Sequence, residues 1–268
     1  MNSLLDAIAN GVQIIDLAHP LWNGMPCSPN HPGFRMSLLR RHGDGVRPDG
    51  SSAANELIVT GGHVGTHIDA LSHVSHQGQL HGGIDAAEAQ RGGRFSHHGV
   101  DTIKPLFTRG VLLDVAAAKG VEVLEGGYPI TPDDLEEAAA HGGVEVREGD
   151  VALVRSGWAH RFDTAESFLG HETGVPGPNE DAAHWLADRG IVATGADSTA
   201  YEHIPPGEGH RVLPAHRILL VEEGINIIEV MNLEDLSAAG VHEFLFVLAP
   251  LKILGGTGSP VRPLAVVA

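Results

Sequence analysis

Short apolar segments, each bounded by glycine, proline or small polar residues, recur along the whole chain. Apolar runs of this length are typical of buried β-strands, and the flanking residues are those that form turns. The predicted strands cover residues 12–18, 34–41, 55–60, 111–115, 150–156, 191–196, 225–230, 244–254 and 264–267. A chain with this pattern is expected to build its core on a sheet.

Helices with clear end signals lie between several of these strands. Thr131 followed by Pro132 is an N-cap pattern, and we expect that helix to end at Gly142. Asn179 begins another helix, which is expected to end near Gly190. Further helices are predicted at residues 3–10, 214–223 and 233–239. Because strands dominate the first half and alternate with helices in the second, the pattern favours a single α/β domain, residues 1–268, with a mixed sheet.

Long irregular segments separate the predicted elements, and such segments are often functional. Residues 19–34 hold Trp22, and they form either a packed surface loop or a wall of a substrate pocket. Residues 74–98 are rich in His and Gly, and their imidazoles are either solvated or additional ligands. Trp22 and His81 are our candidates for substrate binding.

The charge balance disfavours several classes of partner. The 268-residue chain has 17 Lys and Arg against 34 Asp and Glu, a formal net charge of −17. Without a basic stripe to neutralise phosphates, binding to nucleic acid or to an anionic membrane is not expected. Cys27 is the only cysteine, so an intrachain disulfide is excluded. The first residues resemble neither a signal peptide nor a membrane span, and we therefore expect a cytoplasmic protein.

The most informative stretch reads His-Val-Gly-Thr-His-Ile-Asp-Ala-Leu-Ser-His. Its metal-binding side chains are His63, His67, Asp69 and His73. Imidazole and carboxylate together suit Zn, Mn or Fe, and the lack of a thiolate in the stretch argues against a structural zinc site. The alternative is a His-rich surface loop in a chain with 18 His. The ordered spacing favours the metal site.

Neither a regular helix nor a regular strand brings all four side chains to one ion. On a helix, His63 and His67 share a face but Asp69 points away from it. On a strand all four share a face, but at ~3.3 Å per residue the ends lie ~33 Å apart. Metal–ligand bonds are only ~2 Å long. We therefore expect the segment to curl back on itself, helped by the backbone freedom of glycines such as Gly65.

This stretch resembles the signature His-x-Gly-Thr-His-x-Asp-x-x-x-His of the cyclase-like metal-dependent hydrolases, a family that includes bacterial kynurenine formamidase and isatin hydrolase. Residues 14–17 followed by Met25-Pro26 resemble the family's N-terminal part, and residues 216–233 resemble its second signature. The resemblance implies a swivelling β/β/α architecture. It also implies homodimers or homotetramers, with residues 1–50 as an arm that contacts a neighbouring subunit.

Two more ligands are expected from the second half of the chain. Glu229 lies in the apolar run 225–230, where a buried carboxylate is unfavourable unless it is paired or bound to metal. The alternative is a strand residue that faces solvent, and for His216 it is an imidazole on a helix surface. The resemblance implies that Glu229 and His216 complete a centre of one or two ions begun by the first motif.

The chemistry expected of such a centre is metal-assisted hydrolysis. A metal lowers the pKa of bound water from ~15.7 to ~7 and stabilises a developing oxyanion. His63, His67 and Asp69 are expected to hold the metal, Mn or Zn, since both accept these ligands. His73 is the candidate catalytic residue, because imidazole titrates near neutrality and can carry a proton to the leaving group.

The predicted activity is hydrolysis of a non-peptide carbon–nitrogen bond in a small amide. The resemblance points to a cyclic amide or imide such as isatin, or to an N-aryl formamide. The alternatives are a lactone hydrolase of the same family and a non-catalytic relative that binds metal or ligand. Other schemes lack their motifs: Ser156 is not in a Gly-x-Ser-x-Gly elbow, and residues 255–258 resemble a phosphate loop only superficially.

Overall fold

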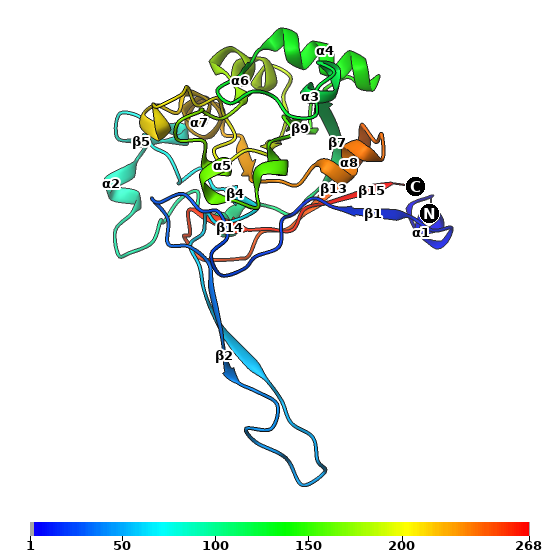
Figure 1. Cartoon of the computed structure of the whole chain (residues 1–268). Coiled ribbons are helices and arrows are strands. Elements are labelled where there is room, and N and C mark those ends of the chain that lie inside the picture. The colour runs from blue at the N-terminus through cyan, green and yellow to red at the C-terminus, as the bar shows by residue number, and fades with distance from the viewer. Residues whose placement is uncertain (1–2, 268) are drawn as a thin grey trace.

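A nine-stranded mixed sheet forms the centre of the computed structural model, which describes residues 3–267 (Figure 1). The strand order is β1-β15-β13-β7-β9-β11-β12-β4-β14. The group β7-β9-β11-β12 is parallel, and the other pairings in this sheet are antiparallel. The strands are β1 Gln13–Asp16, β4 His67–Asp69, β7 Leu106–Asp114, β9 Val151–Arg155, β11 Ala193–Ala196, β12 Asn226–Glu229, β13 Glu243–Leu248, β14 Gly258–Pro260 and β15 Leu264–Val267.

Helices and two-stranded pairs surround this sheet. The α-helices are α1 Ser3–Ala9, α2 Ala86–Ala89, α3 Val115–Ala118, α4 Pro132–Gly142, α5 Ala165–Leu169, α6 Glu180–Ala187, α7 Pro214–His216 and α8 Glu234–Ala238. A π-helical segment, Arg217–Glu223, continues α7. The small pairs are β2 Arg35–Arg40 with β3 Asn55–Val59, β5 Gln79–Leu80 with β6 Ile84–Asp85, and β8 Pro129–Ile130 with β10 Gly177–Pro178. No helix within residues 3–267 combines the length and the apolarity needed to cross a bilayer.

The central parallel strands are buried on both faces, as parallel strands usually are. All five residues of β9 are buried. Ala152 and Val154 belong to the core that α3, α4 and α6 cover, whereas Val151 and Leu153 belong to the core on the opposite face. Both faces of β9 therefore need apolar side chains, which explains why this stretch is continuously apolar rather than alternating.

The second core is enclosed by the sheet itself, which curls around it. Ile15 of β1, Ile68 of β4 and Phe246 of β13 meet in this core, although β1 and β4 lie far apart in the strand order. The curl brings the chain after β1 beside the chain after β12, where the Asn232 amide donates to the Leu17 carbonyl. The predicted single-domain α/β fold with a mixed sheet is confirmed.

Several predicted element boundaries differ from the observed ones, and the strand predicted at 111–115 begins five residues earlier, at Leu106 of β7. The predicted strand 244–254 ends at Leu248, because Pro250 cannot donate to a neighbouring strand. The chain then returns as β14, which the sequence did not predict and which pairs with β4. In α4, Gly142 remains helical, and Gly143 with a φ of 62° ends the helix.

β2 and β3 form a long hairpin that projects from the body of the molecule (Figure 1). Every residue of both strands is exposed. Their large exposed apolar side chains are Met36, Leu38, Leu39, Leu57, Ile58 and Val59. The projecting part is centred on residues 35–59 rather than on the predicted arm 1–50, since β1 belongs to the main sheet.

Candidate metal centre

β4 lies between β12 and β14, and it carries His67 and Asp69. Residues two apart on a strand point to the same face, so these two side chains lie side by side. In the antiparallel register with β12, His67 is opposite Glu229, which brings the glutamate next to them. Strand pairing therefore gathers three metal-binding side chains, and all three are buried.

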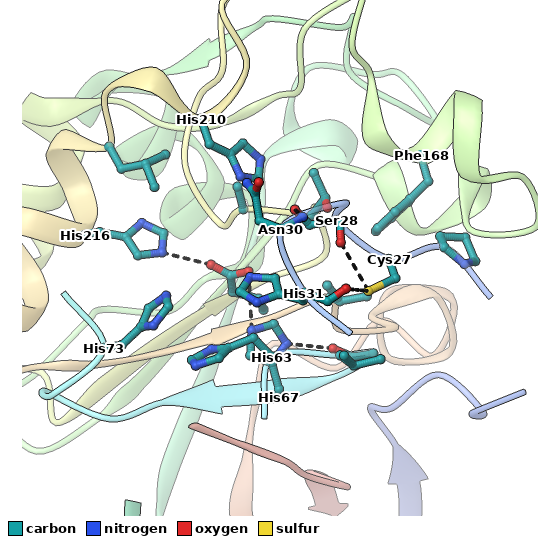
Figure 2. A pocket seen from close by; sticks show the side chains of 18 residues that line it. Cys27, Ser28, Asn30, His31, His63, His67, His73, Phe168, His210 and His216 are labelled. Atoms are coloured by element: carbon teal, nitrogen blue, oxygen red, sulfur yellow. Dashed lines mark hydrogen bonds and ion pairs between the residues drawn. The ribbon is translucent and has the colours of Figure 1, made fainter. Parts of the chain in front are cut away.

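The backbone beside β4 turns back, as the spacing of the motif requires. Gly65 has a φ of 64°, and a Cβ atom there would lie 2.5 Å from the side chain of Leu21, so this position requires glycine. The rings of His63 and His73 stack with their centroids 3.9 Å apart. Figure 2 shows both rings beside the strand that carries His67. The predicted curl is present in the structure.

Asp69 is the centre of the cluster. Its Oδ1 lies 2.7 Å from Nδ1 of His63 and 3.5 Å from Nε2 of His67. Its Oδ2 lies 3.6 Å from Nε2 of His216 and 4.0 Å from Nε2 of His73. This Oδ2 is buried and accepts no hydrogen bond from the described part of the chain. A buried carboxylate oxygen without a donor is unfavourable, and it marks a position that a cation fits.

His216 reaches the cluster from the end of α7. Its Nε2 lies 3.0 Å from Oε1 of Glu229. Its Nδ1 lies 2.6 Å from Oε1 of Glu202, and the two oxygens of Glu202 also accept from the backbone amides of Ala215 and His216. Because an ionised carboxylate only accepts, Nδ1 carries a proton and Nε2 faces the cluster. His216 and Glu229 are both buried, which excludes the surface alternatives for these two residues.

His67 is oriented by the backbone instead. Its Nδ1 donates to the carbonyl of Gly65 at 2.7 Å. Its Nε2 is thereby left facing Asp69 and Glu229, each at 3.5 Å. A hydrogen bond on the second ring nitrogen of a metal-binding histidine sets both its tautomer and its orientation.

Strained backbone lies next to the cluster. Val230, which follows Glu229, has a φ of 55°, and Tyr201, which precedes Glu202, has a φ of 60°. These left-handed conformations are unfavourable for a β-branched or bulky side chain, and they persist only where the surroundings enforce them. The hydroxyl of Thr66 donates to the Val230 carbonyl at 2.5 Å and so helps to hold one of them.

Burial and mutual contacts shift the pKa values of these groups. Burial by itself raises the pKa of Asp69, but His73, His216 and His63 hold it well below its ordinary value. Burial lowers the pKa of His216, but the neighbouring carboxylates of Asp69, Glu202 and Glu229 raise it well above its ordinary value. Burial lowers the pKa of His73 to about 4. At neutral pH the metal-free cluster is therefore ionised at Asp69, protonated at His216 and neutral at His73.

The donor set fits a divalent metal with nitrogen and oxygen ligands. Two groups of three residues bring ligand atoms within 4.8 Å of one another: His63, Asp69 and His73 form one, and His67, Asp69 and Glu229 form the other. Both groups contain Asp69, so the cluster offers positions for one ion or for two. Imidazole nitrogen with carboxylate oxygen suits Zn and Mn. His73 lies close enough to act as a ligand or as a proton carrier.

A cavity of about 240 Å³ lies beside the cluster (Figure 2). Besides the metal-binding side chains, His31 and His210 contribute polar atoms to its lining. The apolar part of the lining includes Val64, Phe168, Ala200, Leu213 and Val230. In Figure 2, Phe168 lies across the cavity from His73 and His216. Ligand pockets commonly measure roughly 300–1,000 Å³, so this cavity suits a small molecule.

The structure does not bring Trp22 or His81 to this cavity. Trp22 packs edge-on against Phe162, and Phe162 packs edge-on against Phe168, which lines the cavity. The ring of Phe162 therefore separates Trp22 from the cavity lining. Nδ1 of His81 lies 3.0 Å from the carbonyl oxygen of Val221. It therefore supports the π-helical segment that follows α7.

Three residues of the site escaped the sequence analysis. His31 lines the cavity and stacks against His63, with centroids 5.2 Å apart. His210 lines the cavity from the loop before α7, and Glu202 lies behind His216. None of the three has a ligand-like spacing to the first motif. The usable signal for His31 was its position in the irregular segment 19–34, which the sequence did predict, whereas Glu202 and His210 lie between the predicted strand 191–196 and the predicted helix 214–223.

Comparison with known proteins agrees with this arrangement. The model of the Cyclase family matches residues 15–203. The chain belongs to the cyclase family. Isatin hydrolase from Roseibium aggregatum is 30% identical over 223 residues, which make up 82% of this chain and 77% of that protein. The resemblance inferred from the His-rich motif is thereby confirmed.

Solved structures of similar proteins extend the match to the fold. A crystal structure described as a novel cyclase has a TM-score of 0.85 and 28% identity, over 95% of this chain and 88% of that chain. A structure described as a predicted metal-dependent hydrolase from Bacillus stearothermophilus has a TM-score of 0.62 and 25% identity, over 96% and 98%. The family model ends before His216 and Glu229, so the geometry is what joins these two side chains to the cyclase motif.

We expect Glu202→Gln to weaken metal binding about 10- to 100-fold. An amide cannot accept from Nδ1 of His216 and from both backbone amides at once, so the imidazole loses its orientation. Calorimetric titration of the metal-free protein with Zn²⁺ measures the loss. Glu208→Gln is the matched control, because Glu208 pairs with Arg211 on the surface. Equal losses in the two variants would contradict the role given to Glu202.

Metal uptake at neutral pH is expected to release protons. The raised pKa of His216 keeps this imidazole protonated in the metal-free protein, and a ligand must lose its proton before it binds metal. Affinity should therefore increase as the pH rises through neutrality. Titrations in buffers of different ionisation enthalpy count the protons released. His216→Asn should release fewer protons on metal binding than the unmodified protein does. An unchanged number of released protons would rule out His216 as their source.

Proposed function

We propose that this protein is a metal-dependent hydrolase that cleaves the carbon–nitrogen bond of a small neutral amide. The candidate substrates are a cyclic amide or imide of the isatin kind and an N-aryl formamide. The observation that carries the proposal is the buried cluster around Asp69, whose Oδ2 lacks a donor, beside a cavity of small-molecule size. The name of the 30% identical relative, isatin hydrolase, supports the choice of bond.

The side chains proposed to hold the metal are His63, His67, Asp69, His216 and Glu229. A divalent metal bound by such donors makes water acidic enough to yield hydroxide at neutral pH and stabilises negative charge on a carbonyl oxygen. The contribution of the protein is to keep the donors oriented. The Gly65 carbonyl and the Glu202 carboxylate do this for two of the imidazoles.

His73 is the proposed proton carrier. Its side chain is 25% exposed and lines the cavity, whereas Asp69 beside it is 1% exposed. Because burial lowers the pKa of His73 to about 4, the ring is neutral at physiological pH. This value lies below the near-neutral pKa expected from the sequence, but the neutral ring has a free nitrogen that can take a proton from the attacking water and deliver it to the leaving nitrogen.

The cavity lining supports a neutral substrate. Within residues 3–267 neither lysine nor arginine lines the cavity, so a carboxylate or phosphate on the substrate would find no side chain of fixed positive charge there. Phe168 and Val64 instead offer apolar surface to a ring. We therefore place neutral lactams, imides and formanilides ahead of amides that carry an amino-acid group.

We expect His73→Ala to keep the metal and to lose about 10²- to 10⁴-fold in turnover, because it removes the proton carrier but not the donors proposed to hold the metal. Asp69→Ala should lose both metal and turnover. Each protein is stripped of metal by chelation and reloaded with Mn²⁺ or Zn²⁺. Its turnover is then measured on a panel of cyclic imides, lactams, lactones and N-aryl formamides. Metal analysis of each variant accompanies the rate measurement.

Other outcomes of this experiment have distinct meanings. If His73→Ala loses its metal together with its turnover, His73 is a ligand rather than a proton carrier. Cleavage of lactones alone would identify the substrate as an ester rather than an amide. Metal binding without cleavage of any member of the panel would favour a non-catalytic relative. His97→Ala, at a histidine outside the cavity lining, is the control and should change neither property.

We also propose that the protein forms a homodimer or homotetramer through the β2–β3 hairpin. The hairpin exposes large apolar side chains on both strands and projects from the body, so its own chain does not cover them (Figure 1). Exposed apolar surface of this kind is typical of interfaces between proteins. A second copy of the chain would cover it.

The double substitution Met36→Glu and Ile58→Glu is expected to shift the protein toward monomers. These residues are opposite each other on the hairpin, and two charges there oppose the burial of the apolar face. Light scattering coupled to size-exclusion chromatography measures the mass of each variant. Ser51→Glu, near the tip, adds one of the same charges and should leave the mass unchanged. A monomeric unmodified protein would refute the proposal.

A further inference from the structure

The segment Gly255-Gly256-Thr257-Gly258 lies against the metal centre. Oγ1 of Thr257 is 2.9 Å from Nε2 of His63, although 194 residues separate them in the sequence. The Thr257 carbonyl accepts from the amide of Ala70, directly after β4. A Cβ atom at Gly258 would lie 2.5 Å from the ring of His63, so the glycine allows the imidazole to pack against this backbone. The segment therefore packs against the ring of His63 and contacts its Nε2 through the Thr257 hydroxyl.

His63 has hydrogen-bonding partners on both ring nitrogens. Nδ1 lies 2.7 Å from Oδ1 of Asp69, inside the cluster, and Nε2 faces the hydroxyl of Thr257. Asp69 is ionised and can only accept, so Nδ1 carries a proton in the metal-free protein. A metal on Nδ1 would require the other neutral tautomer of the ring, in which the single proton has moved from Nδ1 to Nε2 by exchange with solvent. Nε2 would then donate.

A hydroxyl suits this requirement because it both donates and accepts. Thr257 can donate to an unprotonated Nε2, and by rotating its O–H it can accept from a protonated one. A backbone amide at this place could not accept. A carboxylate could not donate, and it would add a third negative charge to those of Asp69 and Glu229.

We propose that Thr257 is a positioning residue of the metal centre, which holds Nε2 of His63 so that Nδ1 faces the metal. His67 and His216 are held in the opposite sense, because their Nδ1 atoms bond Gly65 and Glu202 and their Nε2 atoms face the cluster. The centre would thus present Nδ1 of one imidazole and Nε2 of the other two to a metal. This inference rests on the proposed metal centre, but not on the identity of the substrate.

The first test is metal affinity. Thr257→Val keeps the shape of the side chain and removes the hydroxyl, and we expect it to weaken Zn²⁺ binding about 10- to 100-fold in calorimetric titration of the metal-free protein. Thr257→Ser keeps the hydroxyl and should bind Zn²⁺ nearly as well as the unmodified protein. Equal affinity in the valine and serine variants would overturn the proposal.

A matched control separates this role from a general loss of stability. Thr108 Oγ1 donates to the Gly149 carbonyl at 2.9 Å, away from the cluster, so Thr108→Val removes a comparable hydrogen bond. Both valine variants should lower the thermal unfolding temperature of the metal-free protein to a similar extent. Only Thr257→Val should also weaken the binding of Zn²⁺, and equal weakening by Thr108→Val would argue for a structural role alone.

The second test needs no substitution in Thr257. Long-range ¹⁵N–¹H correlation spectra of the Zn²⁺-loaded protein distinguish the two imidazole tautomers, and His63→Gln assigns the signal of His63. We expect His63 with its proton on Nε2, and His67 and His216 with their protons on Nδ1. A proton on Nδ1 of His63 in the loaded protein would refute the inference. Failure of the unmodified protein to bind Zn²⁺ or Mn²⁺ would instead refute the metal centre itself.

Discussion

The burial of Asp69 among imidazoles is the interaction on which the rest of this structure depends. Removing a carboxylate from water costs several kcal/mol unless opposite charge and donors replace the lost hydration. Oδ1 of Asp69 accepts a hydrogen bond from Nδ1 of His63, but Oδ2 has no donor among the described residues. Glu229 adds a second carboxylate to the same cluster. In the metal-free protein the proton on His216 partly balances these charges, and a divalent cation would balance them more fully.

Three different groups hold the imidazoles around this carboxylate. His67 is bonded to a backbone carbonyl, His216 to a buried carboxylate and His63 to a hydroxyl. Each partner constrains its ring through the nitrogen that does not face the cluster, which is Nδ1 in His67 and His216 and Nε2 in His63. Left-handed backbone lies at Tyr201, which precedes Glu202, and at Val230, which follows Glu229. Strain at these points is consistent with a site that is held in one geometry before any ligand arrives.

The side chains proposed to hold the metal and the cavity lining have different structural origins. β4 and β12 carry three of the donors, and strand pairing leaves little freedom in their placement. The cavity is lined largely by irregular segments, among them the loop that holds His31 and the loop that holds His210. Loops tolerate sequence change better than paired strands do. The same metal chemistry can therefore be combined with different substrates by changing these loops.

The sequence by itself determined the first half of the centre, because His63, His67, Asp69 and His73 lie within one short segment whose spacing demands a curl. It also predicted buried strands in a mixed sheet, since strands buried on both faces must be continuously apolar. The apolar run around Glu229 indicated a buried carboxylate but left a solvent-facing residue open, and the family resemblance was needed to join Glu229 and His216 to the centre.

Only the tertiary structure decided which distant residues complete the site. Glu202 and Thr257 reach the histidines across 14 and 194 residues, through contacts that no periodicity encodes. Trp22 is near the cavity loop in sequence, but packing against Phe162 turns it away from the lining. The physical reason is that hydrophobic spacing specifies which face of a strand is buried, whereas the path of each loop depends on the packing of the whole chain.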